Sequence, residues 1–141
     1  MPGGATGWAL LSAGFAGLTA LLAKLGMRGV PVDLAVAVRT TVVLALAWGV
    51  ALARVPIGTM RMPPPAAWGF LVLSGLATGA SWLCYFRALS MGNLARVAAI
   101  DKLGFVLAAV LGVVVLGERP SPTLWAGLVC IAAGVWLATR G

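Results

Sequence analysis

Long apolar stretches separated by short polar segments run through the whole sequence. A helix needs about 20 apolar residues to cross the ~30 Å hydrocarbon layer of a membrane. Only helices and closed barrels satisfy backbone hydrogen bonds in lipid, and these stretches are far too long for barrel strands. The pattern therefore predicts five membrane-spanning helices, which cover residues 6–26, 33–53, 66–89, 94–116 and 123–139.

Proline, glycine and polar residues mark the ends of these predicted helices. Pro31 follows the first helix, and proline both fixes its own φ and disfavours helix in the residue before it. The run 63–65 of three prolines lies in the longest connection, and the segment 117–122 is predicted to form a tight hairpin. These boundaries predict an all-α integral membrane protein in which residues 1–141 form a single transmembrane domain.

The composition agrees with a membrane protein, because 62% of the residues are hydrophobic and 9% are charged. A soluble domain carries roughly a quarter of its residues as charged side chains, so a soluble helical bundle does not fit. The net charge of +7 comes from ten Lys and Arg that are scattered singly. A nucleic-acid site needs them clustered on one face, so we expect a lipid bilayer as partner and no nucleic acid.

Few side chains are available for catalysis or for metal binding. The chain has no histidine, and its three acids are Asp33, Asp101 and Glu118. Cys84 and Cys130 lie far apart in apolar stretches and are expected to be lone buried thiols. No phosphate-binding loop or metal-ligand cluster is present, so we expect neither an enzyme nor a cofactor or metal. The first 23 residues carry no charged side chain, which favours a retained first helix over a cleaved signal.

Charged residues also fall inside the predicted spans. A charge at the centre of a membrane helix costs about 2.5–3.5 kcal/mol, and less near the interface. Arg39 lies about two turns into the second span, and Asp101 and Lys102 lie about two turns into the fourth. Neighbouring helical residues point about 100° apart, so Asp101 and Lys102 are predicted on different faces. One interpretation is that Asp101, with Lys102 or Arg39 as its basic partner, lines a polar cavity. The alternative is structural: the charges form an internal ion pair that fixes the helix register, or their side chains snorkel to the membrane interface. Lys24 is near a helix end and is predicted to snorkel.

The aromatic residues divide into two groups. Trp8, Trp68 and Trp125 begin predicted spans, where an interfacial aromatic belt is expected. Trp82 and Tyr85 lie one turn apart in the interior of the third span and share a face. They either pack against helices and lipid or form a cavity wall that stacks on an organic solute.

Small residues recur at helical spacing in the third and fourth spans. Gly75 and Gly79 have the GxxxG spacing, and Gly104, Ala108 and Gly112 form one stripe. Small residues let membrane helices approach closely. We expect these glycines to mediate packing within the chain, with a dimer seam as the alternative.

Several residues together form a recognisable pattern. They are Arg39, Tyr85-Phe86-Arg87-Ala88-Leu89, Gly92, Ile100-Asp101-Lys102-Leu103, Leu116-Gly117-Glu118-Arg119, Gly127 and Ala133-Gly134. In this pattern the chain resembles the EamA domain of the drug/metabolite transporter superfamily. It departs from that domain at Gly104-Phe105, where a proline is common, and it lacks the glutamate found in the first helix of the four-helix multidrug relatives.

The resemblance implies a transporter of a small organic metabolite, with efflux as one direction, in the plasma (inner) membrane. Such transporters usually carry two five-helix repeats of opposite orientation around a central cavity, and this chain is similar to one repeat. It therefore implies a homodimer, antiparallel or parallel, or a pairing with a homologous subunit. The alternative is a non-transporting membrane subunit of a hetero-oligomeric complex.

The candidate residues follow from these arguments. The substrate-pathway candidates are Asp101, Lys102, Arg39, Trp82 and Tyr85. Glu118 and Arg119 are expected to form a structural pair in the last hairpin.

The basic residues near helix ends give a weak indication of orientation. On the N-terminal side lie Arg54, Arg61 and Arg119, and on the opposite side lie Lys24, Arg28, Arg87, Arg96 and Arg140. This distribution weakly favours a cytoplasmic C-terminus. A weak bias is what a dual-topology dimer requires.

Overall fold

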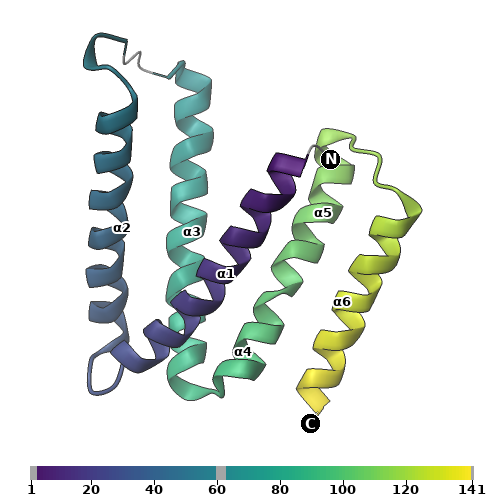
Figure 1. The fold of residues 1–141 in the computed structure, drawn as a ribbon. Helices are drawn as coiled ribbons and strands as arrows, with labels where there is room; N and C mark the ends of the chain where they lie inside the picture. Colours follow the sequence, from purple (N-terminus) through teal and green to yellow (C-terminus); the bar gives the residue numbers. More distant parts are fainter. Residues whose placement is uncertain (1–2, 60–62, 141) are drawn as a thin grey trace. The chain divides into compact units, whose positions relative to one another are not determined.

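The computed structural model of the chain describes residues 3–59 and 63–140, which form helices joined by short connections (Figure 1). The helices are α1 (Gly3–Gly26), α2 (Val32–Arg54), the short 3₁₀ helix η1 (Ile57–Thr59), α3 (Pro65–Met91), α4 (Leu94–Asp101), α5 (Leu103–Leu116) and α6 (Pro122–Arg140). Arg61, one of the basic residues used for the orientation, lies outside the described residues.

Within residues 3–59 and 63–140, five helical stretches are long and apolar enough to cross a membrane. They are Gly4–Gly26, Val32–Arg54, Pro65–Met91, Leu94–Leu116 and Pro122–Arg140. The predicted all-α fold with five membrane spans is confirmed, because each span lies within about three residues of its predicted limits.

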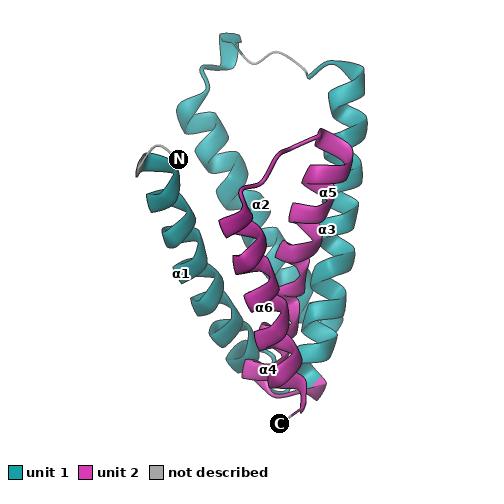
Figure 2. Cartoon of the chain, turned by 90° about the vertical axis from the view of Figure 1, so that its right-hand side faces the viewer, with its two compact units in different colours: residues 1–90 teal, residues 91–141 magenta. Residues whose placement is uncertain are grey.

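The chain divides into two compact units (Figure 2). The first, residues 1–90, contains α1, α2 and α3, and the second, residues 91–141, contains α4, α5 and α6. Within the second unit α6 contacts both α4 and α5. A single transmembrane domain over residues 1–141 stays a prediction.

Local side-chain bonds explain where two helices of the second unit begin. The Asn93 side-chain oxygen accepts a hydrogen bond from the Ala95 N–H at 2.9 Å at the start of α4. The Ser121 hydroxyl accepts one from the Leu124 N–H at 3.2 Å at the start of α6. Pro122 is the first residue of α6, a position where the missing N–H of proline leaves no helical bond unmade.

The apolar pattern predicts one regular helix for the fourth span. The structure instead interrupts this helix at Lys102. The Lys102 N–H donates to the Ala99 carbonyl at 3.1 Å, and the Phe105 N–H donates to the Lys102 carbonyl at 3.1 Å. Both bonds span three residues, so the chain tightens locally to a 3₁₀-type turn between α4 and α5. The charges of Asp101 and Lys102 lie at this turn, but they do not predict the turn itself, because neither a proline nor a polar loop marks it.

The α5–α6 hairpin turns at Gly117, whose φ of +68° favours glycine. The Glu118 N–H donates to the Gly112 carbonyl at 3.2 Å, and the Glu118 side chain folds back over the same residue. A Cβ at position 112 would lie 2.8 Å from Oε2 of Glu118. Gly112 therefore makes room for the hairpin's own carboxylate. The expected Glu118–Arg119 pair is wrong, since in the described chain no ion pair joins these two residues.

Gly75, Gly79 and Gly104 have no such neighbour. A Cβ added at any of the three would meet no atom within 4 Å in its own unit. The packing partner that the sequence predicts for them within the chain is therefore not found inside either unit. The alternative, that these three glycines form a dimer seam, stays a prediction.

Most large apolar side chains are exposed on the surface of the isolated chain, as lipid-facing residues are. The buried side chains include Phe86 and Leu89 in α3, which are 2% and 0% exposed. Cys84 and Cys130 are unpaired but exposed, so the prediction that they are buried is wrong. Both cysteines therefore lie on outward faces of their helices in the isolated chain.

Candidate functional site

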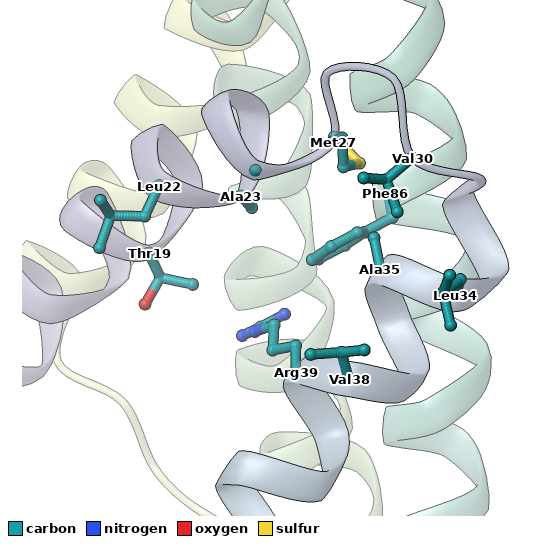
Figure 3. A pocket seen from close by; sticks show the side chains of 11 residues that line it. Thr19, Leu22, Ala23, Met27, Val30, Leu34, Ala35, Val38, Arg39 and Phe86 are labelled. Carbon is teal, nitrogen blue, oxygen red and sulfur yellow. The ribbon is translucent and has the colours of Figure 1, made fainter.

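A cavity of about 480 Å³ lies within the first unit. Its lining includes Thr19 and Leu22 from α1, Met27 from the α1–α2 connection, Val38 and Arg39 from α2, and Phe86 from α3 (Figure 3). Sites for small molecules commonly have volumes of about 300–1,000 Å³ and mostly apolar walls with a few polar groups. The cavity has the size and lining of such a site.

Arg39 is the charged residue of this lining. It lies seven residues after the first residue of α2, about 10 Å along the helix at 1.5 Å per residue. Its Cζ atom lies 4.2 Å from the ring centroid of Trp82 and 5.2 Å from that of Phe86. Both distances fall within the ~6 Å range of cation–π interactions, so α3 supplies two aromatic contacts to a cation on α2.

The two aromatic contacts are large enough to matter for Arg39. Each contributes about 0.5–2 kcal/mol, depending on how far the cation is shielded from water. The cost of a charge within a membrane helix is about 2.5–3.5 kcal/mol at the centre and less nearer the interface. The rings of Trp82 and Phe86 thus offset much of this cost without neutralising the charge.

Phe86 belongs to the site although sequence reasoning did not identify it as a site residue. It is four residues after Trp82, so both rings lie on the face of α3 toward Arg39. Tyr85 contacts Phe86 edge to face, with ring centroids 6.3 Å apart and planes inclined by 63°. Figure 3 shows the Phe86 ring between Met27 and the Arg39 guanidinium in that view. The spacing of four residues was the signal that could have identified Phe86. We call Arg39, Trp82, Tyr85 and Phe86 the Arg39 cluster.

Lys24 links α1 to the end of α3. Its Nζ donates a hydrogen bond to the backbone carbonyl of Leu89. Leu89 is in the last turn of α3, where carbonyls lack helical partners and a cation is favourable. The prediction that Lys24 snorkels stays a prediction, and the Leu89 carbonyl gives its ammonium group a partner at a helix end. Lys24 thereby joins two of the helices that form the cavity wall.

Asp101 and Lys102 lie in the second unit, at the interruption between α4 and α5. The Lys102 Nζ is 3.9 Å from Oδ2 of Asp101, and their side chains are 46% and 47% exposed. The predicted separation of the two residues onto different faces stays a prediction, since Lys102 keeps helical φ and ψ angles of −65° and −18° and its flexible side chain still reaches the carboxylate of Asp101. An ion pair this exposed contributes little to stability, about 0–1 kcal/mol.

The five predicted pathway residues therefore form two groups. Arg39, Trp82 and Tyr85 belong to the cluster in the first unit, and Asp101 and Lys102 form the ion pair in the second. In the ranges that the structure describes, no group of three His, Cys, Asp or Glu residues is placed to hold a metal ion. A pathway role for the five residues stays a prediction.

Comparisons with known proteins give a consistent picture. Residues 4–140 match the model of the EamA-like transporter family. The chain is 49% identical over 133 residues to a protein of Sinorhizobium sp. named "Uncharacterized transporter in cobO 3'region", and the match covers 92% of each chain. No solved structure matches the chain.

Proposed function

Since the chain belongs to the EamA-like transporter family and is a multi-pass membrane protein, we propose that it carries a small organic solute across the plasma membrane. The observation that carries this proposal is the cavity of the first unit, which has apolar walls and a charged guanidinium within a membrane span. An ionisable residue inside a span that lines a cavity is typical of a substrate pathway. The Arg39 cluster is the solute-binding part of this pathway.

Asp101 and Lys102 are the second part of the proposed pathway. Both are charged, and both lie where the fourth span is interrupted. In transporters, interrupted helices bring charged groups and backbone dipoles to the solute or to a coupling ion. The pair is half exposed within the isolated chain and so remains accessible to a solute.

The functional unit is proposed to be a pair of such chains. Only a small set of side chains is buried among the described residues, with Phe86 and Leu89 the most fully enclosed. The open faces at Gly75 and Gly79 are suited to close helix approach in a dimer. A homodimer, with antiparallel copies as one arrangement, or a pair with a homologous subunit would supply ten helices.

Release of solutes from proteoliposomes tests the transport proposal. Liposomes containing purified protein are loaded with a defined mixture of small organic acids, amines and neutral compounds, and release is followed by mass spectrometry. Wild type should release at least one compound faster than protein-free liposomes, and Asp101→Asn should abolish that release. Equal rates in Asp101→Asn and wild type would remove Asp101 from the pathway.

The competing function is a membrane subunit that does not transport by itself. It predicts no release of any compound by the purified chain and recovery of a stable complex with a different protein after mild extraction. That combined outcome would replace the transporter proposal. Release by the purified chain alone would reject the competitor.

A further inference from the structure

The cavity chemistry points to the class of solute, and this inference rests on the proposed function. We infer that the cavity of the first unit binds an organic monoanion with an apolar body, whose anionic group contacts the guanidinium of Arg39 while its body contacts the apolar walls. The juxtaposition that carries the inference is one cation stacked on aromatic rings at the wall of an apolar cavity.

The charge of Arg39 is not neutralised within its unit. The one acid of the first unit is Asp33, at the start of α2, and among the described residues no ion pair joins it to Arg39. The Arg39 Cζ atom lies over the Trp82 ring, and a cation–π contact of this kind does not consume the N–H groups of the guanidinium as hydrogen-bond donors. These N–H groups match the geometry of a carboxylate, which a guanidinium binds through two parallel hydrogen bonds.

The number of available cations limits the charge of the solute. Lys24, the other cation near the cavity, already donates to the Leu89 carbonyl. Among the described residues of the lining, Arg39 is therefore the single cation that faces a ligand. One guanidinium balances one negative charge, whereas a second negative charge would be desolvated without a partner. A cationic solute would meet an unscreened like charge.

The apolar walls of the cavity determine the chemical character of the part of the solute that carries no charge. Leu22, Met27, Val38 and Phe86 are apolar, and Thr19 supplies the hydroxyl of the lining. A sugar-like solute would bury several hydroxyl groups against these walls without partners, which is unfavourable for each group. A ring or a branched hydrocarbon instead gains contact with Phe86 and the aliphatic residues.

Equilibrium binding of matched probes tests this inference without requiring transport. The protein is placed in nanodiscs of phosphatidylcholine, and binding of naphthoate, naphthamide and naphthylmethylammonium is measured by calorimetry. The three probes share one ring system and differ in charge. Wild type should bind naphthoate about tenfold or more tightly than naphthamide, because a hydrogen bond to a charged group is worth at least that factor. The ammonium probe should bind most weakly.

Two variants of α2 assign the preference to one residue. Arg39→Gln should bind naphthoate and naphthamide equally, whereas Arg54→Gln, a change at the exposed last residue of the same helix, should retain the wild-type preference. Retained binding of naphthamide by Arg39→Gln shows that the cavity is intact. If that variant binds neither probe, Arg39→Lys decides, because a retained preference for naphthoate supports the inference and its loss overturns it.

The inference is overturned if wild type binds naphthamide as tightly as naphthoate, or if Arg39→Gln keeps the preference. Discs that also contain phosphatidylglycerol test whether the anion is a lipid headgroup instead. Unchanged naphthoate binding there supports a solute site, and its loss would assign the cavity to lipid. A naphthoate preference without any release from liposomes would reject transport and leave this inference standing.

Discussion

The contact between Arg39 and Trp82 should be measurable as an energetic coupling. The Arg39 Cζ atom lies 4.2 Å from the Trp82 ring centroid, well within the ~6 Å range of the interaction. Both side chains are half-buried, so the contact lies between the exposed value of about 0.5–1 kcal/mol and the desolvated value of about 2 kcal/mol. We therefore expect a coupling free energy of about 1–2 kcal/mol.

A double-mutant cycle isolates this coupling from the loss of packing. The free energy of unfolding is measured for wild type, Arg39→Met, Trp82→Leu and the double variant, by titration with dodecyl sulfate in mixed micelles followed by circular dichroism. Trp82→Leu should lower the free energy of unfolding by about 1–2 kcal/mol more when Arg39 is present than when methionine replaces it.

A second tryptophan provides the matched control. Trp48 lies on the same helix as Arg39, nine residues further along, and is 57% exposed. It is about 13 Å from Arg39 along the helix axis, so a cycle between Trp48→Leu and Arg39→Met should couple by less than about 0.5 kcal/mol. If the Trp82 and Trp48 cycles give the same coupling, the cation–π explanation for the charge in this span is refuted.

Three further outcomes follow from the structure. Lys24→Met should lower the free energy of unfolding by about 1–3 kcal/mol in the same titration, because it leaves a buried carbonyl at the end of α3 without its donor; an unchanged value would contradict the contact. Gly117→Ala should lower the free energy of unfolding by about 1–2 kcal/mol, because φ is +68° at this residue. Gly127→Ala, in the interior of α6, should not lower it, and equal effects of the two substitutions would contradict the left-handed turn at Gly117. Cysteines added at either terminus, with the native cysteines replaced, should be labelled from both membrane faces in intact cells if the copies are antiparallel, and each from a single face if they are parallel.

The five spans could be predicted because lipid imposes a strict length on apolar helices. Proline and glycine at the ends, such as Pro31 and Gly117, place the limits within a few residues. The interruption at Lys102 could not be predicted, because it is a change from four-residue to three-residue hydrogen bonds within one predicted span. Hydropathy responds to side chains and carries no information on such a change.

The sequence predicts only those parts of the candidate site that differ from the apolar residues around them. Arg39 stands out because a cation in an apolar span is costly, and Trp82 stands out as a large ring in the same part of the third span. Phe86 does not stand out, since an apolar ring in an apolar span is the expected background. The roles of Lys24 and Glu118 depend on contacts with the Leu89 carbonyl and with Gly112, which hydropathy does not encode.

The most direct test of the central claim, that the transported solute occupies the cavity of the first unit, is protection of that cavity from modification. Thr19→Cys introduces a thiol into the lining and Leu11→Cys introduces one on the exposed part of α1, both in protein whose native cysteines are replaced. The solute that wild-type liposomes release should slow the reaction of Thr19→Cys with a small membrane-permeant maleimide and leave that of Leu11→Cys unchanged. Equal reaction rates of Thr19→Cys with and without the solute would contradict the claim.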